Sequence, residues 1–192
     1  MKKILFPTEF ANHAPEVFKY AVELAYVFKA SIILLHAYGK PEYDLTSDEL
    51  LESRKNRVME NMIKFVQTHL PEEHRTQIEM DYVAKIGYPN KVILEVAAEE
   101  EVDLIVMGMT SQVNTLETIF GTTSKDILNK AKCPVLAIPS SAKFKGINNI
   151  VYPTNFGFGD LDAMNYLKLW SSTFDVAIHL TTPHIFLKSI VL

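Results

Sequence analysis

Short apolar runs alternate with amphipathic segments over the first 139 residues. Five runs are typical of strands and cover residues 3–7, 31–37, 78–86, 103–108 and 134–138. Four segments between them have the composition and spacing of helices and cover residues 15–30, 46–70, 90–101 and 123–131. Parallel neighbouring strands need long crossover connections, and helices supply them. The pattern therefore predicts a three-layer α/β sandwich, with a five-stranded parallel sheet and helices on both faces.

Two local features support the first two predicted helices. In the first helix, one stripe with helical spacing contains Val17, Ala21, Leu24, Ala25 and Phe28. In the second, Thr46 stands three residues before Glu49, which is the arrangement of a capping box. The run at 31–37 is apolar without interruption, as expected of a strand covered on both faces.

The sequence repeats itself at an offset of 146 residues. The stretch IVYPTNF at 150–156 matches ILFPTEF at 4–10, and the same offset pairs Tyr20 with Tyr166 and Phe28 with Phe174. We therefore predict a domain at residues 1–140 and an incomplete second copy at 146–192, with a strand, a helix and a strand. Such a βαβ unit cannot bury both faces of its sheet. It either packs on the first domain, packs on a second chain or lacks order.

Composition excludes several classes of function. Acidic residues outnumber basic ones by 23 to 19, for a net charge of −4, so we expect no binding to nucleic acid or to an anionic membrane. The single cysteine, Cys133, excludes an internal disulfide and a thiolate metal cluster. Pro7 and Glu9 interrupt the first apolar run too early for a signal peptide. We expect a soluble, cytoplasmic protein.

The segment between the fourth strand and the fourth helix is the main candidate for a binding site. It runs from Gly108 to Ser124 and carries a second glycine, Gly121, beside a run of hydroxyl residues. The backbone N–H groups at a helix start attract anions, and a glycine lets a phosphate approach closely. Glycine at a strand end and threonine at a helix start are also common without any ligand. Known phosphate fingerprints such as G-x-x-x-x-G-K-[ST] are absent from the sequence.

Several separated motifs together resemble the universal stress protein family. They are the proline-led PTEF after the first strand, AVELA at 21–25, LLH at 34–36, DLIVMG at 103–108 and CPVLAIP at 133–139. Nucleotide-binding members carry G-x-x-G, nine residues, then G-[ST], and this spacing is kept here by Gly108, Ser111, Gly121 and Thr122. The partial repeat is similar to tandem members of the family. The resemblance implies an adenine nucleotide alpha hydrolase-like, Rossmann-like fold.

The resemblance also implies ATP, with or without Mg²⁺, in a cleft at the strand ends. Pro7, Thr8 and Ala37 would lie near adenine and ribose, and Glu9 takes the place of an acid that contacts the ribose or a metal. The residues that would follow the sugar and the phosphates are Met107, Gly108, Thr110, Ser111, Gly121, Thr122, Thr123 and Ser124. In the family the last strand commonly pairs with a second domain, so we expect a homodimer through residues 133–139.

Two substitutions leave two functional classes open. Ser111 stands where the family has glycine, and Glu9 stands where it usually has aspartate. The first class is an ATP-responsive regulator of the stress response, and the second is an interaction module with a degenerate pocket. We assign no catalytic residue, because the predicted cleft offers Glu9 and hydroxyls without a histidine or lysine partner; slow ATP hydrolysis is the most that we expect.

The remaining chemically active residues have simpler structural roles. His36 ends the second strand, and His13, His69 and His74 lack the spacing of metal ligands, so we assign no metal site. Cys133 has an apolar setting that favours an inert thiol. In the partial repeat Asn155 replaces the acid and the glycine loop is missing, so we expect no nucleotide there.

Overall fold

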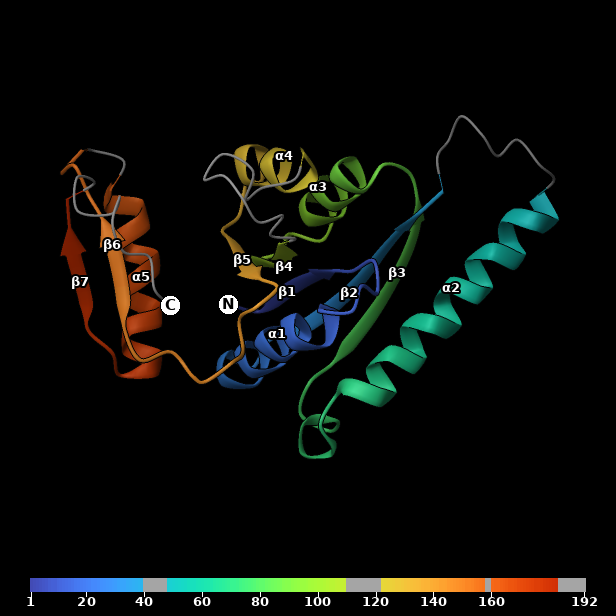
Figure 1. Ribbon diagram of the computed structural model, residues 1–192, viewed down its shortest axis with the longest axis horizontal. Helices are drawn as coiled ribbons and strands as arrows, with labels where there is room; N and C mark the ends of the chain where they lie inside the picture. Colours follow the sequence, from blue (N-terminus) through green and yellow to red (C-terminus); the bar gives the residue numbers. More distant parts are fainter. Residues whose placement is uncertain (40–47, 110–121, 158–159, 183–192) are drawn as a thin grey trace. The chain divides into compact units, whose positions relative to one another are not determined.

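The computed structural model describes residues 1–39, 48–109, 122–157 and 160–182, which form two compact units, Met1–Phe144 and Lys145–Leu192. In the first unit five parallel strands form one sheet, as predicted (Figure 1). The strands are β1 (Lys3–Pro7), β2 (Ser31–Tyr38), β3 (Met80–Ile86), β4 (Leu104–Met109) and β5 (Val135–Pro139). Each begins within two residues of its predicted start.

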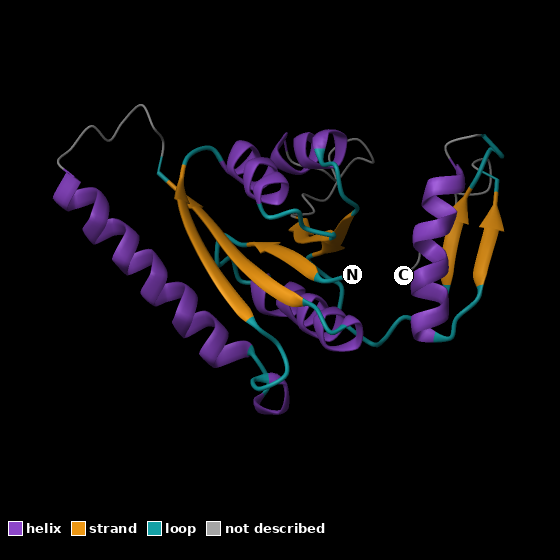
Figure 2. Cartoon of the chain, turned by 180° about the vertical axis from the view of Figure 1, so that it is seen from behind, coloured by secondary structure: helices purple, strands orange, loops and turns teal. Residues whose placement is uncertain are grey.

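Helices cover both faces of this sheet, which confirms the predicted three-layer α/β class (Figure 2). The helices are α1 (Ala14–Phe28), α2 (Asp48–His69), α3 (Pro89–Glu99) and α4 (Thr122–Lys130), and a short 3-10 turn, η1 (Glu72–His74), was not predicted. Thr46 of the predicted capping box lies outside the described residues. Helices α1 and α2 contact one face of the sheet. Helices α3 and α4 lie over the other face (Figure 1).

Strand order explains where a ligand could bind. The sheet has the order β3-β2-β1-β4-β5, so the chain builds outward from β1 in one direction and then crosses to the other side at β4. Ile4 pairs with Ile32 on one edge of β1 and with Leu104 on the other. In such sheets the two loops that leave β1 and β4 diverge, and a crevice opens between them at the carboxyl ends.

The core follows from the apolar patterns of these central strands. Leu5, Ile33 and Ile105 point to one face and form a cluster with α3 and α4. On helix α1, Val17, Ala21, Leu24 and Ala25 of the predicted stripe are buried, whereas Phe28 is half-buried. The stripe prediction is therefore correct for most of the helix.

The second unit contains β6 (Ile150–Pro153), α5 (Asp160–Phe174) and β7 (Ile178–Thr181), and its two strands pair in parallel. Backbone details of the first unit recur in it 146 residues later. Phe10 and Phe156 have φ of 57° and 59°, and Lys29 and Asp175 both have φ of 52°. Both pairs of residues therefore occupy the left-handed region that non-glycine residues rarely adopt.

Hydrogen bonds recur at the same offset. The amide of Thr8 donates to the carbonyl of Leu35, and the amide of Thr154 donates to that of Thr181. The hydroxyls of Thr8 and Thr154 each accept the amide two residues further on, at 3.0 and 2.8 Å. The turn after the first strand of each unit thus has one geometry.

The two units differ at the start of the helix that follows this turn. The first unit has Ala14 there, whereas the second has Asp160, whose carboxylate accepts hydrogen bonds from the hydroxyls of Thr154 and Tyr152. The hydrogen bond from Thr154 has the largest effect and, with that from Tyr152, holds the pKa of the Asp160 carboxyl below its usual value. Helix α5 also carries Asp162 in its first turn. A negative charge of the chain itself therefore compensates this helix start.

Core truncation should separate buried from exposed leucines in the first unit. Leu5 is fully buried in the β1 core, whereas Leu128 on α4 is 39% exposed. Leu5→Ala should lower the free energy of unfolding by about 2–5 kcal/mol, and Leu128→Ala should change it by about 0.5 kcal/mol or less. Urea unfolding followed by far-UV circular dichroism measures both, and equal losses would contradict the assigned core.

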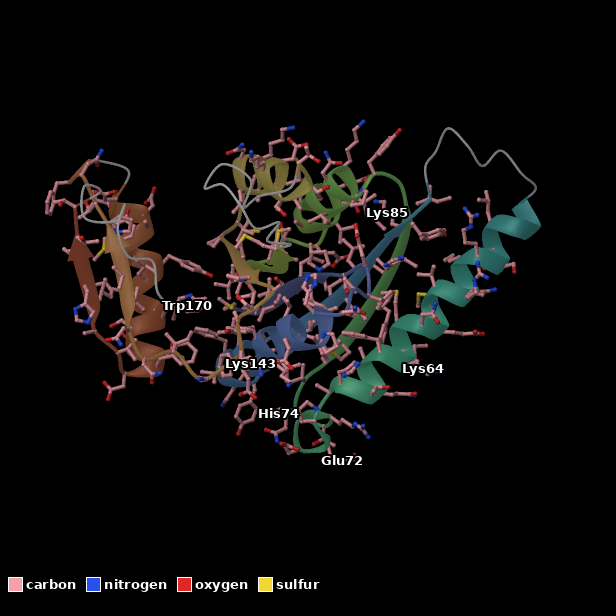
Figure 3. The ribbon with its side chains drawn as sticks, in the orientation of Figure 1. Lys64, Glu72, His74, Lys85, Lys143 and Trp170 are labelled. Carbon is pink, nitrogen blue, oxygen red and sulfur yellow. The ribbon has the colours of Figure 1, made fainter. Side chains whose placement is uncertain are left out.

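Acid should destabilise the second unit through Asp160. A carboxyl whose pKa is lower in the folded state contributes stability above its unfolded pKa of about 3.9 and loses it as the pH falls through the folded value. Asp160→Asn should therefore flatten the fall in stability below about pH 5. Fluorescence of Trp170, which lies on α5 (Figure 3) and is the single tryptophan, reports this unit. Asp162→Asn is the control in the same helical turn, and an identical acid profile for the two variants would contradict the assignment.

Candidate functional site

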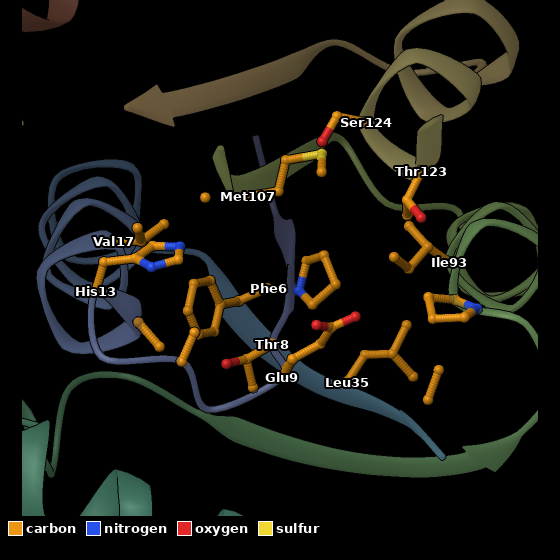
Figure 4. A pocket seen from close by; sticks show the side chains of 16 residues that line it. Phe6, Thr8, Glu9, His13, Val17, Leu35, Ile93, Met107, Thr123 and Ser124 are labelled. Carbon is orange, nitrogen blue, oxygen red and sulfur yellow. The ribbon is translucent and has the colours of Figure 1, made fainter. Parts of the chain in front are cut away.

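A cavity opens at the carboxyl ends of β1, β2 and β4, where the strand order reverses. Figure 4 shows its lining, which comes from the β1–α1 turn, the two neighbouring strands and the starts of α3 and α4. Eight residues that the sequence assigned to a nucleotide site line it: Pro7, Thr8, Glu9, Ala37, Met107, Gly108, Thr123 and Ser124. Residues far apart in the sequence are thus brought to one place.

The other four predicted residues do not belong to the described lining. Thr110, Ser111 and Gly121 lie outside the described residues. Thr122 is the first residue of α4, as expected of a helix that starts there, but its side chain is exposed and does not line the cavity. In α4 the hydroxyl residues on the cavity are therefore Thr123 and Ser124.

The β1–α1 turn forms one wall of the cavity and is held by specific contacts. Thr8 is buried, and its carbonyl accepts a hydrogen bond of 2.7 Å from Nδ1 of His36. The His36 ring also stacks on Phe10, with centroids 4.9 Å apart. His36 therefore fixes the turn from β2, which agrees with the structural role that we expected for it.

Gly108 has a packing role that the sequence did not reveal. A Cβ atom at this position would lie 2.8 Å from Nε2 of His13 and 3.1 Å from Cγ2 of Val17. A side chain at this position would require His13 and Val17 to shift, so the glycine lets both side chains pack closely on the end of β4. This close packing accounts for a glycine at position 108 whether or not a ligand binds nearby.

Two of the helix starts at the cavity carry no negative charge of their own. Pro89 of α3 and Thr123 of α4 both line the cavity, and neither helix has an acidic residue in its first turn. Helix α1 also begins at the cavity, with Ala14, and its N-cap residue His13 makes no side-chain capping hydrogen bond. The starts of three helices thus lie around one space.

The polar side chains of the lining correct one expectation. We expected no histidine in the cleft, yet His13 lines the cavity together with Glu9. The turn between β1 and α1 is short, and this brings the first residues of the helix to the carboxyl end of the strand. The position of His13, six residues after Pro7 and at a helix start, could have indicated this.

Other chemically active groups lie away from the cavity. Among the described residues, no group of three or more histidine, cysteine, aspartate or glutamate side chains could hold a metal ion. Cys133 is half-buried against the α3–α4 core, and burial raises the pKa of its thiol, as an inert packing role requires. In the described part of the chain, no helix is apolar over a length that would cross a bilayer.

Comparison with known proteins places this architecture in a family. The model of the universal stress protein family matches residues 1–139. A universal stress protein of Methanocaldococcus jannaschii is 26% identical over 152 residues, covering 71% of this chain and 94% of the relative. One of Thermus aquaticus is 29% identical over 143 residues, covering 71% of this chain and 98% of the relative.

Solved structures have the same fold. The universal stress protein UspA from Lactobacillus plantarum aligns with a TM-score of 0.56 and 24% identity, over 71% of this chain and 97% of that one. A universal stress protein solved in complex with cAMP aligns with a TM-score of 0.51 and 15% identity, over 73% of this chain and 98% of that one. Sheet order, helix placement and sequence therefore agree that the chain belongs to the universal stress protein family.

Proposed function

We propose that the cavity binds an adenine nucleotide, ATP in particular, and that the protein is a regulatory module of the stress response. In this role the ligand changes the stability or the contacts of the protein and undergoes no required chemical step. The observation that carries the proposal is the meeting of three helix starts at the crevice between β1 and β4.

The electrostatics of the cavity favour an anion on the α4 side. Helices α3 and α4 lack acidic residues in their first turns, so their macrodipoles are not compensated there. The hydroxyls of Thr123 and Ser124 add donors at the same place. The described lining contains no lysine or arginine, so Mg²⁺ bound with the phosphates would supply the missing positive charge.

Other parts of the lining suit a base and a sugar. Leu35, Ala37 and Ile93 provide apolar surface, and Glu9 offers a carboxylate that can accept hydrogen bonds from ribose hydroxyls. The cavity volume is about 240 Å³, slightly below the roughly 300–1,000 Å³ of typical small-molecule sites. A nucleotide would therefore extend partly beyond the described walls.

One structural neighbour supports the chemical class of the ligand. A universal stress protein with this fold was solved in complex with cAMP, which contains adenine, ribose and a phosphate. The likeness supports the proposal that the ligand of this chain is an adenine nucleotide.

We also propose that residues 146–192 are a partial second copy of the first domain, of the tandem type. The recurrent left-handed residues and hydrogen bonds at the 146-residue offset support this proposal. In this copy Asp160 supplies the charge at the helix start, and Asn155 replaces Glu9. Nucleotide binding is therefore proposed for the first unit alone.

Removing one hydroxyl should weaken ATP binding if α4 holds the phosphates. Thr123→Val keeps the shape of the side chain and deletes one donor, so we expect affinity for ATP with Mg²⁺ to fall about fivefold to tenfold. Thr122→Val is the matched control, because the neighbouring threonine is exposed and lies off the cavity. Isothermal titration calorimetry measures both.

The outcomes of this titration separate the two functional classes. Equal losses in the two variants would place the phosphates elsewhere. No heat with the unmutated protein would reject nucleotide binding and favour an interaction module that keeps only the fold.

We further propose a homodimer through β5. This strand pairs on one edge with β4, and its residues Val135–Ala137 are half-buried at the end of the sheet. An apolar edge strand of this kind pairs readily with another strand.

Light scattering at micromolar concentration should therefore give the mass of a dimer. Leu136→Lys should shift the mass to that of a monomer, because a charge would be buried at the strand edge. Leu128→Lys on α4 is the control and should leave the dimer intact. A monomeric unmutated protein would refute the proposal, as would a Leu136→Lys variant that stays dimeric.

A further inference from the structure

Within the described residues, the imidazole nitrogens of His13 have no structural role. It is the N-cap residue of α1, but its side chain makes no capping hydrogen bond. Among the described residues, its ring nitrogens have no hydrogen-bond partner. The side chain is half-buried and lies on the cavity wall, beside Val17 (Figure 4).

The ring lies at the point where the predicted phosphate loop begins. Nε2 of His13 would be 2.8 Å from a Cβ atom at Gly108, so this nitrogen sits directly over the backbone at the end of β4. The α4 start lies across the cavity, with Thr123 on the opposite side in Figure 4. A ligand that spans the cavity from α4 toward α1 would meet the imidazole.

His13 is also the one side chain of the described lining that can become positive. Glu9 carries the formal negative charge there, and no lysine or arginine accompanies it. Histidine is the side-chain type whose ordinary titration falls between pH 5 and 8. A phosphate group next to Nε2 would favour the protonated ring, because the opposite charges attract each other.

Apart from Glu9, the titratable side chains on the elements around His13 pair with other residues. In the first turn of α1, Glu16 pairs with Lys19 at 2.8 Å. Strand β4 has no titratable side chain from Leu104 to Met109. On α4, Asp126 is held by Lys130 at 3.0 Å and by Asn90. His36 of β2 is bonded to the Thr8 carbonyl, so Glu9 is the titratable group that shares the cavity with His13.

We propose that His13 contacts the phosphates of the bound nucleotide and makes the affinity for phosphorylated ligands depend on pH. This inference rests on the proposed function of the cavity. Protonation at acidic pH adds a charge-assisted hydrogen bond to the phosphates, so nucleotides bind more tightly there. Adenosine, which has no phosphate, gains nothing from the added charge.

The test compares the unmutated protein with His13→Gln, which keeps a polar side chain of similar reach but cannot ionise. Calorimetric titrations with ATP and with adenosine are made at pH 6.0 and pH 8.0. Comparison of the two proteins at each pH cancels the titration of ATP itself. At pH 6.0 we expect the variant to bind ATP about tenfold more weakly, and at pH 8.0 about threefold more weakly or less. Adenosine should bind both proteins equally at both pH values.

A second histidine variant controls for general effects of the substitution. His69→Gln removes a ring that packs on Phe65 of α2 and does not line the cavity. It should leave both affinities and their pH dependence unchanged. Thermal unfolding by circular dichroism verifies that each variant is folded.

The possible failures are distinct. If neither ATP nor adenosine binds the unmutated protein, the proposed function itself is wrong. If ATP binds the unmutated protein and His13→Gln equally at pH 6.0, the nucleotide role stands and the role of His13 is overturned. Equal losses for ATP and adenosine, or losses that do not change with pH, would show that His13 acts only by packing on Gly108.

Discussion

The position of β1 between β2 and β4 is the constraint on which the other features depend. Its core residues Ile4, Leu5 and Phe6 are almost fully buried, and both of its edges are hydrogen-bonded to parallel strands. The chain must therefore leave β1 on one side of the sheet and return at β4 on the other. The two loops diverge at that point, and the cavity lies between them. The chemistry of the site is added to a crevice that topology has already made.

Much of this could be predicted from local patterns. Continuous apolar runs such as 31–37 and the stripe of α1 are imposed by burial, so they are visible without knowledge of the fold. Eight predicted site residues came together because motifs at strand ends must meet at one edge of a parallel sheet. The roles of His13 and Gly108 could not be predicted, because they depend on how closely α1 approaches β4. That distance is set by packing between elements about 90 residues apart.

The two units show which parts of the β1–α1 turn serve folding. Both turns keep a buried threonine whose hydroxyl accepts a backbone amide and a phenylalanine in the left-handed region, although their helix starts differ in charge. The threonine and the left-handed residue therefore build the turn in either setting. What distinguishes the first unit is what stands at the helix start, where Ala14 leaves space and Asp160 in the second unit does not.

The starts of α3 and α4 lack an acidic residue in the first turn, so they forgo stability that an outside anion can restore. Any ligand that binds only the native state raises its stability in proportion to the logarithm of the ligand concentration. If the cavity of the first unit binds nucleotides, the protein would resist unfolding and proteolysis better when the nucleotide concentration in the cell is higher. A fall in the nucleotide concentration would then lower the amount of the protein, without a conformational switch.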